Sequence, residues 1–267
     1  MAILNVTPDS FADGGAHFDF DRAVEAGVRM AADGADIIDV GGESTRPGAD
    51  PLPEEEERRR VLPVIEQLAG RVNVPLSIDT YKARVAREAI AAGASIINDV
   101  SGLLYEPALA SVAAETGAAL ILMHTRGRSR DMYTLARYDD AVAEVTSELS
   151  GAVGRATASG VERESIVVDP GFGFAKKAEH SYEVLAALWR ISEALDRPIL
   201  SGPSRKSFLK AAIGERPPAG RGWGTAAAVS ASVLLGAHLV RVHDVAAMLD
   251  VVRVADRIRG GVRTARD

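Results

Sequence analysis

The sequence predicts an α/β fold, a (β/α)8 barrel of the TIM type formed by a single domain over residues 1–267. The length of 267 residues is close to the about 250 residues typical of this fold. Short, nearly continuous apolar stretches alternate with amphipathic stretches of helical length, a pattern typical of parallel strands that are buried on both faces. Eight such units follow one another, and the chain has no GxGxxG motif of a dinucleotide-binding sheet, which favours the barrel.

The eight predicted strands each precede a polar or glycine-containing segment, as the strands of a barrel precede their loops. They are Ala2–Val6, Asp36–Val40, Leu76–Asp79, Ser95–Asp99, Ala119–Met123, Ile166–Asp169, Ile199–Ser201 and Leu239–Val242.

Start and stop signals mark the helices between these strands. We expect Asp19 or Asp21 to cap the first helix. Pro53 and the acidic run Glu54–Glu57 mark the start of the second helix, where negative charge favours the helix dipole, and we expect this run to be solvated. Glycines that can adopt the left-handed conformation end several helices just before a strand. They are Gly34, Gly93, Gly117 and Gly236. The polar residues 259–267 are expected to form a frayed tail.

Charge and composition exclude several function classes. The net charge is −6, whereas nucleic-acid binders usually carry a basic excess, so an anionic ligand must be held by a few local cations. The absence of cysteine excludes disulfides, thiolate metal sites and cysteine nucleophiles. The sequence shows neither a signal-peptide pattern nor an apolar run of about 18 residues, so we expect a cytoplasmic protein without a membrane partner.

The residues that can carry chemistry follow the predicted strands, where barrels place their active sites. Seven motifs stand there in chain order. They are Asn-Val-Thr-Pro-Asp-Ser-Phe at 5–11, Gly-Gly-Glu-Ser-Thr-Arg-Pro-Gly at 41–48, Ser-Ile-Asp-Thr at 77–80, Asn-Asp-Val at 98–100, Asp-Pro-Gly-Phe-Gly-Phe at 169–174, Ser-Arg-Lys at 204–206 and Arg-Val-His-Asp at 241–244.

In this order, over residues 2–255, the chain resembles the dihydropteroate synthase family of pterin-binding barrels. Each motif alone is weak, but seven separate loops agree. The resemblance implies a transferase of folate biosynthesis, the class that sulfonamides target. Such an enzyme joins p-aminobenzoate to 6-hydroxymethyl-7,8-dihydropterin pyrophosphate and releases 7,8-dihydropteroate and pyrophosphate. It also implies a homodimer.

The pterin site is expected to use the polar ends of several strands. Asp79, Asn98 and Asp169 end three strands, and a carboxylate suits the amidine-like donors of a pterin edge. A helix N-cap is the structural alternative for such residues. The resemblance adds Met123 and Lys206 to the pterin site.

Arg241 is assigned by the resemblance to the face of the pterin ring and to the pyrophosphate. Asp79, Asp169, Lys206 and Arg241 are the expected catalytic residues. Arg205, next to Lys206, is either structural or part of the site.

The pyrophosphate is expected to contact Asn5, Arg46, Arg241 and His243. The resemblance also makes Asn5 a ligand of Mg²⁺, the expected cofactor. Mg²⁺ prefers oxygen ligands and usually bridges substrate phosphates while it keeps several waters. The p-aminobenzoate side is expected to be formed by Thr45, Arg46, Pro47, Phe174 and Ser204.

Two other functions are compatible with a pterin-binding barrel. One is the pterin domain of a corrinoid-dependent methyltransferase, which needs no pyrophosphate or aminobenzoate site, and the Thr45–Pro47 and Ser204–Lys206 motifs argue against it. The other is a non-catalytic pterin-binding partner or regulator. Turnover of both substrates distinguishes the three.

Overall fold

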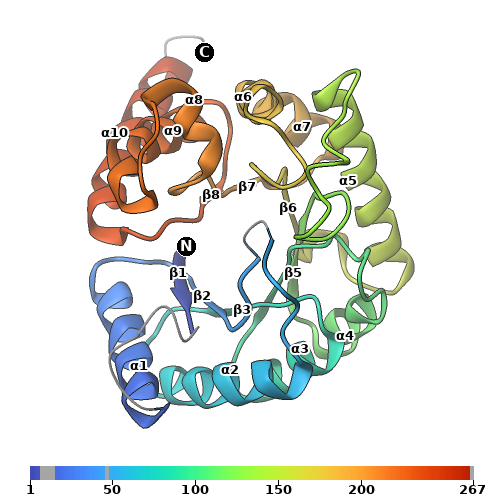
Figure 1. Cartoon of the computed structure of the whole chain (residues 1–267), viewed down its shortest axis with the longest axis vertical. Coiled ribbons are helices and arrows are strands. Elements are labelled where there is room, and N and C mark those ends of the chain that lie inside the picture. Colours follow the sequence, from blue (N-terminus) through green and yellow to red (C-terminus); the bar gives the residue numbers. More distant parts are fainter. Residues whose placement is uncertain (7–15, 46–47, 265–267) are drawn as a thin grey trace.

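The computed structural model describes residues 1–6, 16–45 and 48–264, with only the backbone given for 16–19 and 262–264. Strands and helices alternate along the chain, and the helices surround the strands (Figure 1). Of the residues expected at the active site, Arg46 and Pro47 lie outside the described residues.

All eight predicted strands are present, and their ends lie within two residues of the predicted ends. They are β1 (Ala2–Asn5), β2 (Ile38–Gly41), β3 (Leu76–Asp79), β4 (Ile96–Asp99), β5 (Ala119–Met123), β6 (Ile166–Asp169), β7 (Leu200–Ser201) and β8 (Leu239–Val240).

The strands are parallel and follow one another in chain order. β1 to β6 form one sheet, and β7 and β8 form a second. Single parallel bridges link the two sheets at both junctions, between Val168 and Ile199 and between Ala2 and Val242. The amide of Ile3 also donates to the carbonyl of Val242 at 2.9 Å. These links give the eight strands the order of a (β/α)8 barrel, and they bring the carboxyl ends of all the strands to one rim.

The α-helices lie outside the strands. They are α1 (Ala16–Ala32), α2 (Glu54–Ala69), α3 (Ala83–Ala91), α4 (Ala108–Thr116), α5 (Ala141–Ala158), α6 (Ala178–Ala186), α7 (Leu188–Leu195), α8 (Lys210–Ile213), α9 (Gly222–Leu234) and α10 (Val245–Thr264). No helix within the described ranges is both long and apolar enough to cross a membrane.

The predicted helix ends are confirmed more fully than the predicted starts. The four glycines expected to close helices all have a positive φ, from 70° at Gly117 to 117° at Gly93. Helix α1 already begins at Ala16, so Asp19 and Asp21 lie inside it and the predicted cap is wrong. Residues 259–264, expected as part of a frayed tail, form the last turns of α10.

The acidic run at the start of α2 is only partly solvated. Helix α2 begins after Pro53 as predicted, and Glu54 and Glu55 are on its outer side. Glu57 is only 1 % exposed and pairs with the amino group of Lys82. The expectation of a wholly solvated run was wrong at Glu57, because its side chain faces an internal cation.

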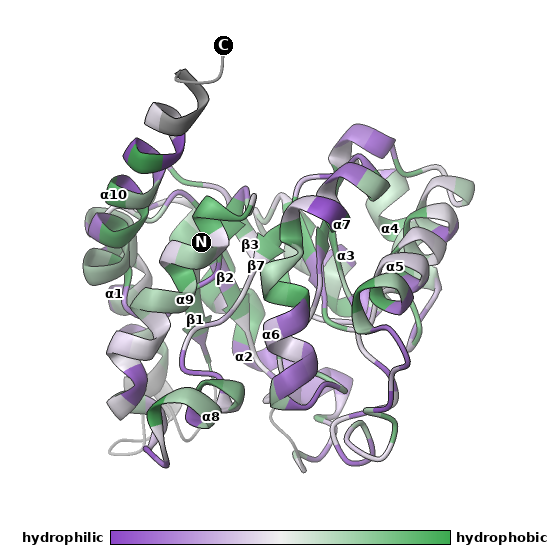
Figure 2. Ribbon diagram, turned by 90° about the horizontal axis from the view of Figure 1, so that it is seen from above, coloured by the Kyte–Doolittle hydropathy of each residue, from purple (hydrophilic) through white to green (hydrophobic). Residues whose placement is uncertain are grey.

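Two apolar layers hold the fold together. The larger one lies between the strands and the helices, and hydrophobic residues are concentrated there (Figure 2). The smaller one comes from the strands and the residues beside them. It comprises Met1, Ile121 and Leu200, packed against Ile37, Ile96, Val167 and Leu239. The smaller layer is the filling of the barrel interior, as expected of a packed barrel core.

Candidate active site

The polar residues of the site form the next layer above this interior filling. Side chains two residues apart on a strand point to the same face. Four site residues follow an apolar residue of the filling by two positions. Asn98 follows Ile96, Met123 follows Ile121, Asp169 follows Val167, and Arg241 follows Leu239. The same alternation that packs the barrel interior therefore directs these side chains to the centre of the rim.

Arg241 connects the polar residues of three strands. Its Nε donates to Asp39 Oδ2 at 2.6 Å, and its Nη2 donates to Asp79 Oδ2 at 2.7 Å. Asn98 Nδ2 donates to the same Asp39 oxygen at 2.9 Å. The structure therefore brings Asp79, Asn98 and Arg241 together, as the sequence predicted.

Asp39 is a member of this cluster that sequence analysis missed. It is fully buried, and its Oδ1 has no hydrogen-bond partner within the described part of the protein. Asp39 follows Ile37 of the interior filling by two residues, the spacing that the other site residues show. A charged residue inside a predicted apolar strand was the signal that could have identified it.

Asp169 occupies the opposite side of the layer, at the end of β6. Its Oδ1 accepts a hydrogen bond from the amide of Gly171 at 2.7 Å, which fixes the carboxylate. Gly202 follows β7, and a Cβ there would lie 3.9 Å from both Asp169 Oδ2 and Arg241 Cβ. A glycine at this position therefore leaves open space between the carboxylate and the arginine.

Lys206 and Phe174 stand together at the rim. The Lys206 Nζ lies 3.9 Å from the centroid of the Phe174 ring, a distance at which a cation is attracted to the ring face. Phe174 belongs to the loop that follows Asp169. Lys206 thus connects the β6 loop to the segment after β7.

Three carboxylates in this layer face two cations, and burial shifts the pKa of two of the carboxylates and of one cation. Burial raises the pKa of Asp79 to about 7, partly offset by Arg241, and it also raises the pKa of Asp169. Burial, together with Arg241, lowers the pKa of Lys206 to about 8. Groups that titrate near neutral pH in a buried cluster are typical of functional sites.

His243 and Ser204 lie side by side at the ends of β7 and β8. The Ser204 Oγ lies 2.9 Å from His243 Nδ1 and accepts a hydrogen bond from the His243 amide at 3.2 Å. Burial and the positive charges of Arg205 and Arg241 lower the pKa of His243 to about 4, so its imidazole is neutral near pH 7. Arg205 pairs with Asp244 at 2.6 Å, which favours a structural role for it.

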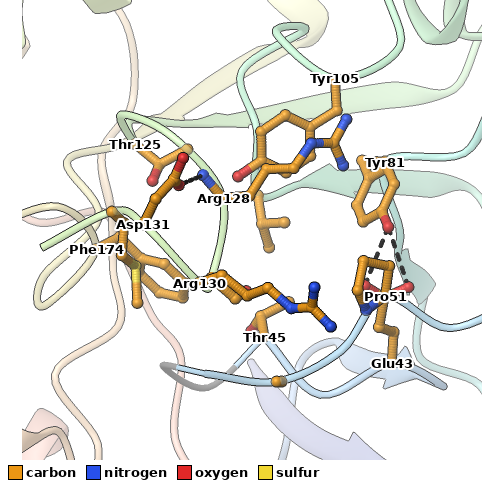
Figure 3. Close-up of a pocket in the computed structure, with 14 residues that line it drawn as sticks. Glu43, Thr45, Pro51, Tyr81, Tyr105, Thr125, Arg128, Arg130, Asp131 and Phe174 are labelled. Carbon is orange, nitrogen blue, oxygen red and sulfur yellow. Dashed lines mark hydrogen bonds between the residues drawn. The ribbon is translucent and has the colours of Figure 1, made fainter. Parts of the chain in front are cut away.

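A cavity of about 270 Å³ opens at the same rim (Figure 3), and Phe174, which contacts Lys206, lines it. Thr45 and Phe174, both expected on the p-aminobenzoate side, line it. Ser204 is not among the residues that line it, and its hydroxyl is bonded to His243.

Four further residues that the motifs did not indicate also line the cavity. They are Tyr81, Tyr105, Arg128 and Arg130. The Arg128 guanidinium lies 4.2 Å from the Tyr105 ring centroid. These residues come from loops without a strong motif, and the fold alone brings them together.

Asn5 lies half-buried at the end of β1, in register with Gly41 of β2. In the described part of the chain, no group of three or more acidic or histidine residues could hold a metal ion by itself.

This arrangement can bind a flat, donor-rich ring between buried carboxylates, an amide and a cation. It can also hold an aromatic molecule in the adjoining cavity. An anionic group would find Arg241, Lys206 and the neutral His243 at the rim.

Comparisons with known proteins agree on one family. The family described as pterin binding enzyme matches residues 1–243. The dihydropteroate synthase of Synechocystis sp. is 44% identical over 258 residues, which cover 97% of this chain and 89% of that protein.

Solved structures give the same result. A Xanthomonas albilineans dihydropteroate synthase with 4-aminobenzoic acid has a TM-score of 0.91 and 44% identity, covering 97% of this chain and 92% of that one. A Yersinia pestis dihydropteroate synthase in a sulfonamide drug complex has a TM-score of 0.90 and 41% identity, covering 97% and 94%.

Proposed function

Because this chain belongs to the dihydropteroate synthase family of pterin-binding enzymes, we propose that it condenses p-aminobenzoate with 6-hydroxymethyl-7,8-dihydropterin pyrophosphate. The products are 7,8-dihydropteroate and pyrophosphate. The chain is a transferase in which the arylamine replaces pyrophosphate on the pterin methylene carbon.

One observation carries the assignment of this reaction to the described site. A buried layer of carboxylates, one amide and two cations adjoins a cavity lined by Thr45 and Phe174. The layer has the donors and acceptors of a pterin edge, and the cavity offers apolar and aromatic surface to a benzoate ring. Two substrates bound in this way would meet near Lys206, which touches the Phe174 ring.

In the proposed pterin pose, Asp169 accepts hydrogen bonds from the ring donors, and Asn98 and Lys206 face the ring heteroatoms. Met123, at the end of β5, packs beside this ring. Charge-assisted hydrogen bonds of this kind are stronger than neutral ones, so they fix the orientation of the methylene carbon.

In the chemical step, the methylene carbon gains a bond to nitrogen and loses its bond to the pyrophosphate oxygen. The nitrogen of p-aminobenzoate attacks the methylene carbon, the carbon–oxygen bond to pyrophosphate breaks, and the nitrogen loses a proton to water. Asp79 and Asp169 stabilise positive charge that spreads into the pterin. Arg241, His243 and Arg46 stabilise the charge of the leaving pyrophosphate.

Mg²⁺ is proposed to arrive with the pyrophosphate. The donor set fits this role, since the amide oxygen of Asn5 adds one hard ligand to phosphate oxygens and water. The ion would supply charge neutralisation for the leaving group.

The p-aminobenzoate side is proposed to use Thr45, Arg46, Pro47, Phe174 and Ser204. Sulfonamides are expected to compete there, and a sulfonamide complex is known for the Yersinia pestis synthase. A homodimer is proposed as well, and a cytoplasmic location stays a prediction from the sequence.

Product analysis tests the proposed function. Incubation with both substrates and Mg²⁺ should give a product with the mass of 7,8-dihydropteroate, and omission of either substrate should abolish it. A sulfonamide should raise the KM for p-aminobenzoate and leave the maximal rate unchanged. Pterin binding without any product would instead indicate a binding protein.

A further inference from the structure

The amino group of Lys82 binds three acceptors from one segment of the chain. Lys82 immediately precedes α3 and is only 8 % exposed. Its Nζ donates to Glu43 Oε2 at 2.6 Å and to the carbonyl of Leu52 at 2.7 Å, and it also pairs with Glu57.

These acceptors lie at both ends of the loop that joins β2 to α2. Glu43 stands two residues after β2, Leu52 stands two residues before α2, and Glu57 lies in the first turn of α2. One ammonium group therefore ties the two ends of this loop to each other and to the end of β3. We call Lys82, Glu43, Glu57 and the Leu52 carbonyl the lysine clamp.

One member of the lysine clamp, Glu43, lines the cavity. The Tyr81 hydroxyl donates to Glu43 Oε1 at 3.0 Å, and both residues line the cavity (Figure 3). Thr45, two residues after Glu43, lines it as well.

Other contacts of the described part of the loop are made by the Gly48 amide, which donates to the Ser129 carbonyl at 2.9 Å, by the Gly42 carbonyl, which accepts from Arg60 Nη1 at 3.1 Å, and by an exposed ion pair between Asp50 and Arg130. Among these contacts of the described residues, the clamp is the buried ionic one.

The charges of the clamp make it sensitive to loss of the lysine. Burial lowers the pKa of Lys82, but hydrogen bonds to Glu43 and Glu57 raise it overall, so the amino group stays charged. Of the four acidic residues Glu54–Glu57, Glu57 alone is buried, and its Oε1 has no hydrogen-bond partner among the described residues. A buried carboxylate without its cation is strongly unfavourable.

We propose that Lys82 is a positioning residue for p-aminobenzoate: it holds the β2–α2 loop so that Glu43, Thr45 and Pro51 line the second-substrate pocket. The inference rests on the proposed function, because it uses the same cavity. Lys82 touches neither substrate in this account. It acts through the loop, so the pterin side at Asp79 and Asp169 keeps its affinity without it.

Replacement of Lys82 tests the proposal, because it should weaken the use of p-aminobenzoate and leave the binding of the pterin pyrophosphate unchanged. In Lys82→Met, the KM for p-aminobenzoate should rise roughly 10- to 100-fold, as expected when a positioned group moves by about an ångström. The dissociation constant for the pterin pyrophosphate should stay near the wild-type value. Hydrogen exchange should become faster in peptides that cover residues 42–53 and stay unchanged in peptides from β4 and β5, a readout that does not depend on turnover.

A double variant separates positioning from stability. Lys82→Met combined with Glu57→Gln removes the more deeply buried of the two carboxylates that lose their cation, so the Tm should recover in part while the KM for p-aminobenzoate stays high. Glu54→Gln, in the same helical turn but outside the clamp, is the matched control and should behave like the wild type.

Recovery of the KM together with the Tm would overturn the proposal, and so would equal loss of affinity for both substrates. Unchanged hydrogen exchange in residues 42–53 of Lys82→Met would also overturn it. A wild-type protein that gives no product would contradict the proposed function instead, while the exchange measurement would still decide on the clamp.

Discussion

Arg241 acts as the internal counter-ion of the pterin site. It is bonded to both Asp39 and Asp79, and Lys206 is the second cation near the same carboxylates. The buried layer combines three carboxylates with these two cations, and the raised pKa of Asp79, about 7, lets the net charge of the layer vary. Such a layer favours a ligand with several N–H donors, and its charge state depends on pH near neutrality.

The activity should therefore show a narrow pH optimum. Asp79, with a pKa of about 7, becomes ionised as the pH rises through 7, and Lys206, with a pKa of about 8, loses its charge as the pH rises through 8. If pterin binding needs an ionised Asp79 and a charged Lys206, kcat/KM for the pterin pyrophosphate should rise up to pH 7 and fall above pH 8. A pH profile of kcat/KM measures this, since it reports groups of the free enzyme.

Two variants assign the limbs of that profile. Asp79→Asn should remove the acidic limb, and Lys206→Gln should remove the alkaline limb, each at a lower overall rate. If the acidic limb remains in Asp79→Asn, or the alkaline limb remains in Lys206→Gln, that limb reports the substrate or another residue. Either result would contradict the assignment.

Asp169→Asn should weaken pterin binding more than p-aminobenzoate binding. The amide keeps the shape of the side chain but loses the charge, and a hydrogen bond to a charged group contributes about 1.5–3 kcal/mol. Calorimetry should thus show roughly 10- to 100-fold weaker binding of the pterin pyrophosphate. Unchanged pterin affinity would exclude this role for Asp169.

At the scale of elements, the loop after β6 is held from inside the protein. The Lys176 amino group, 1 % exposed, donates to the carbonyls of Gly171 and Phe174 at 3.2 and 3.1 Å, and it lies 2.7 Å from His124 Nδ1. Burial lowers the pKa of Lys176 to about 7. This buried contact fixes the backbone that carries Asp169 at one end and Phe174 at the other.

Gly171 is the position where this loop tolerates no side chain. Its φ is +69°, and a Cβ would lie 2.1 Å from the His124 carbonyl oxygen. Gly171→Ala should destabilise the protein by more than about 1 kcal/mol and should lower activity, because the loop must move. Gly154→Ala is the matched control. Gly154 lies on the exposed side of α5 with nothing near its Cβ position, so this change should stabilise by roughly 0.5–1 kcal/mol.

Thermal and chemical unfolding measure both effects. A lower free energy of unfolding in Gly171→Ala and a higher one in Gly154→Ala would support close packing at Gly171. Equal changes in the two variants would contradict it.

The sequence predicted the elements well because each strand is a short apolar run with a glycine or polar residue after it. It predicted Asp79, Asn98 and Asp169 since these residues end strands. It missed Asp39, which lies inside a strand and whose partners, Asn98 and Arg241, reach it only in the folded barrel. It missed the burial of Glu57, because only the tertiary fold places Lys82 beside α2.

At the scale of the whole molecule, α9 and α10 present apolar residues on the surface. Trp223 is 89 % exposed, Val254 62 % and Ile258 50 %. If these residues form the proposed dimer interface, light scattering should give a mass twice the 28.1 kDa of the chain. A charged replacement such as Ile258→Asp should shift the mass toward that of one chain. A concentration-independent mass of 28.1 kDa for the wild type would refute the dimer.

In the proposed function, one rim of the molecule holds a pterin in its buried polar layer and p-aminobenzoate in the adjoining cavity. Release of pyrophosphate from the pterin pyrophosphate tests this claim most directly, measured with and without p-aminobenzoate. The account predicts release in proportion to dihydropteroate formed, dependent on p-aminobenzoate, and strongly reduced in Asp169→Asn. Release at the same rate without p-aminobenzoate, or no release at all from a protein that binds the pterin, would contradict it.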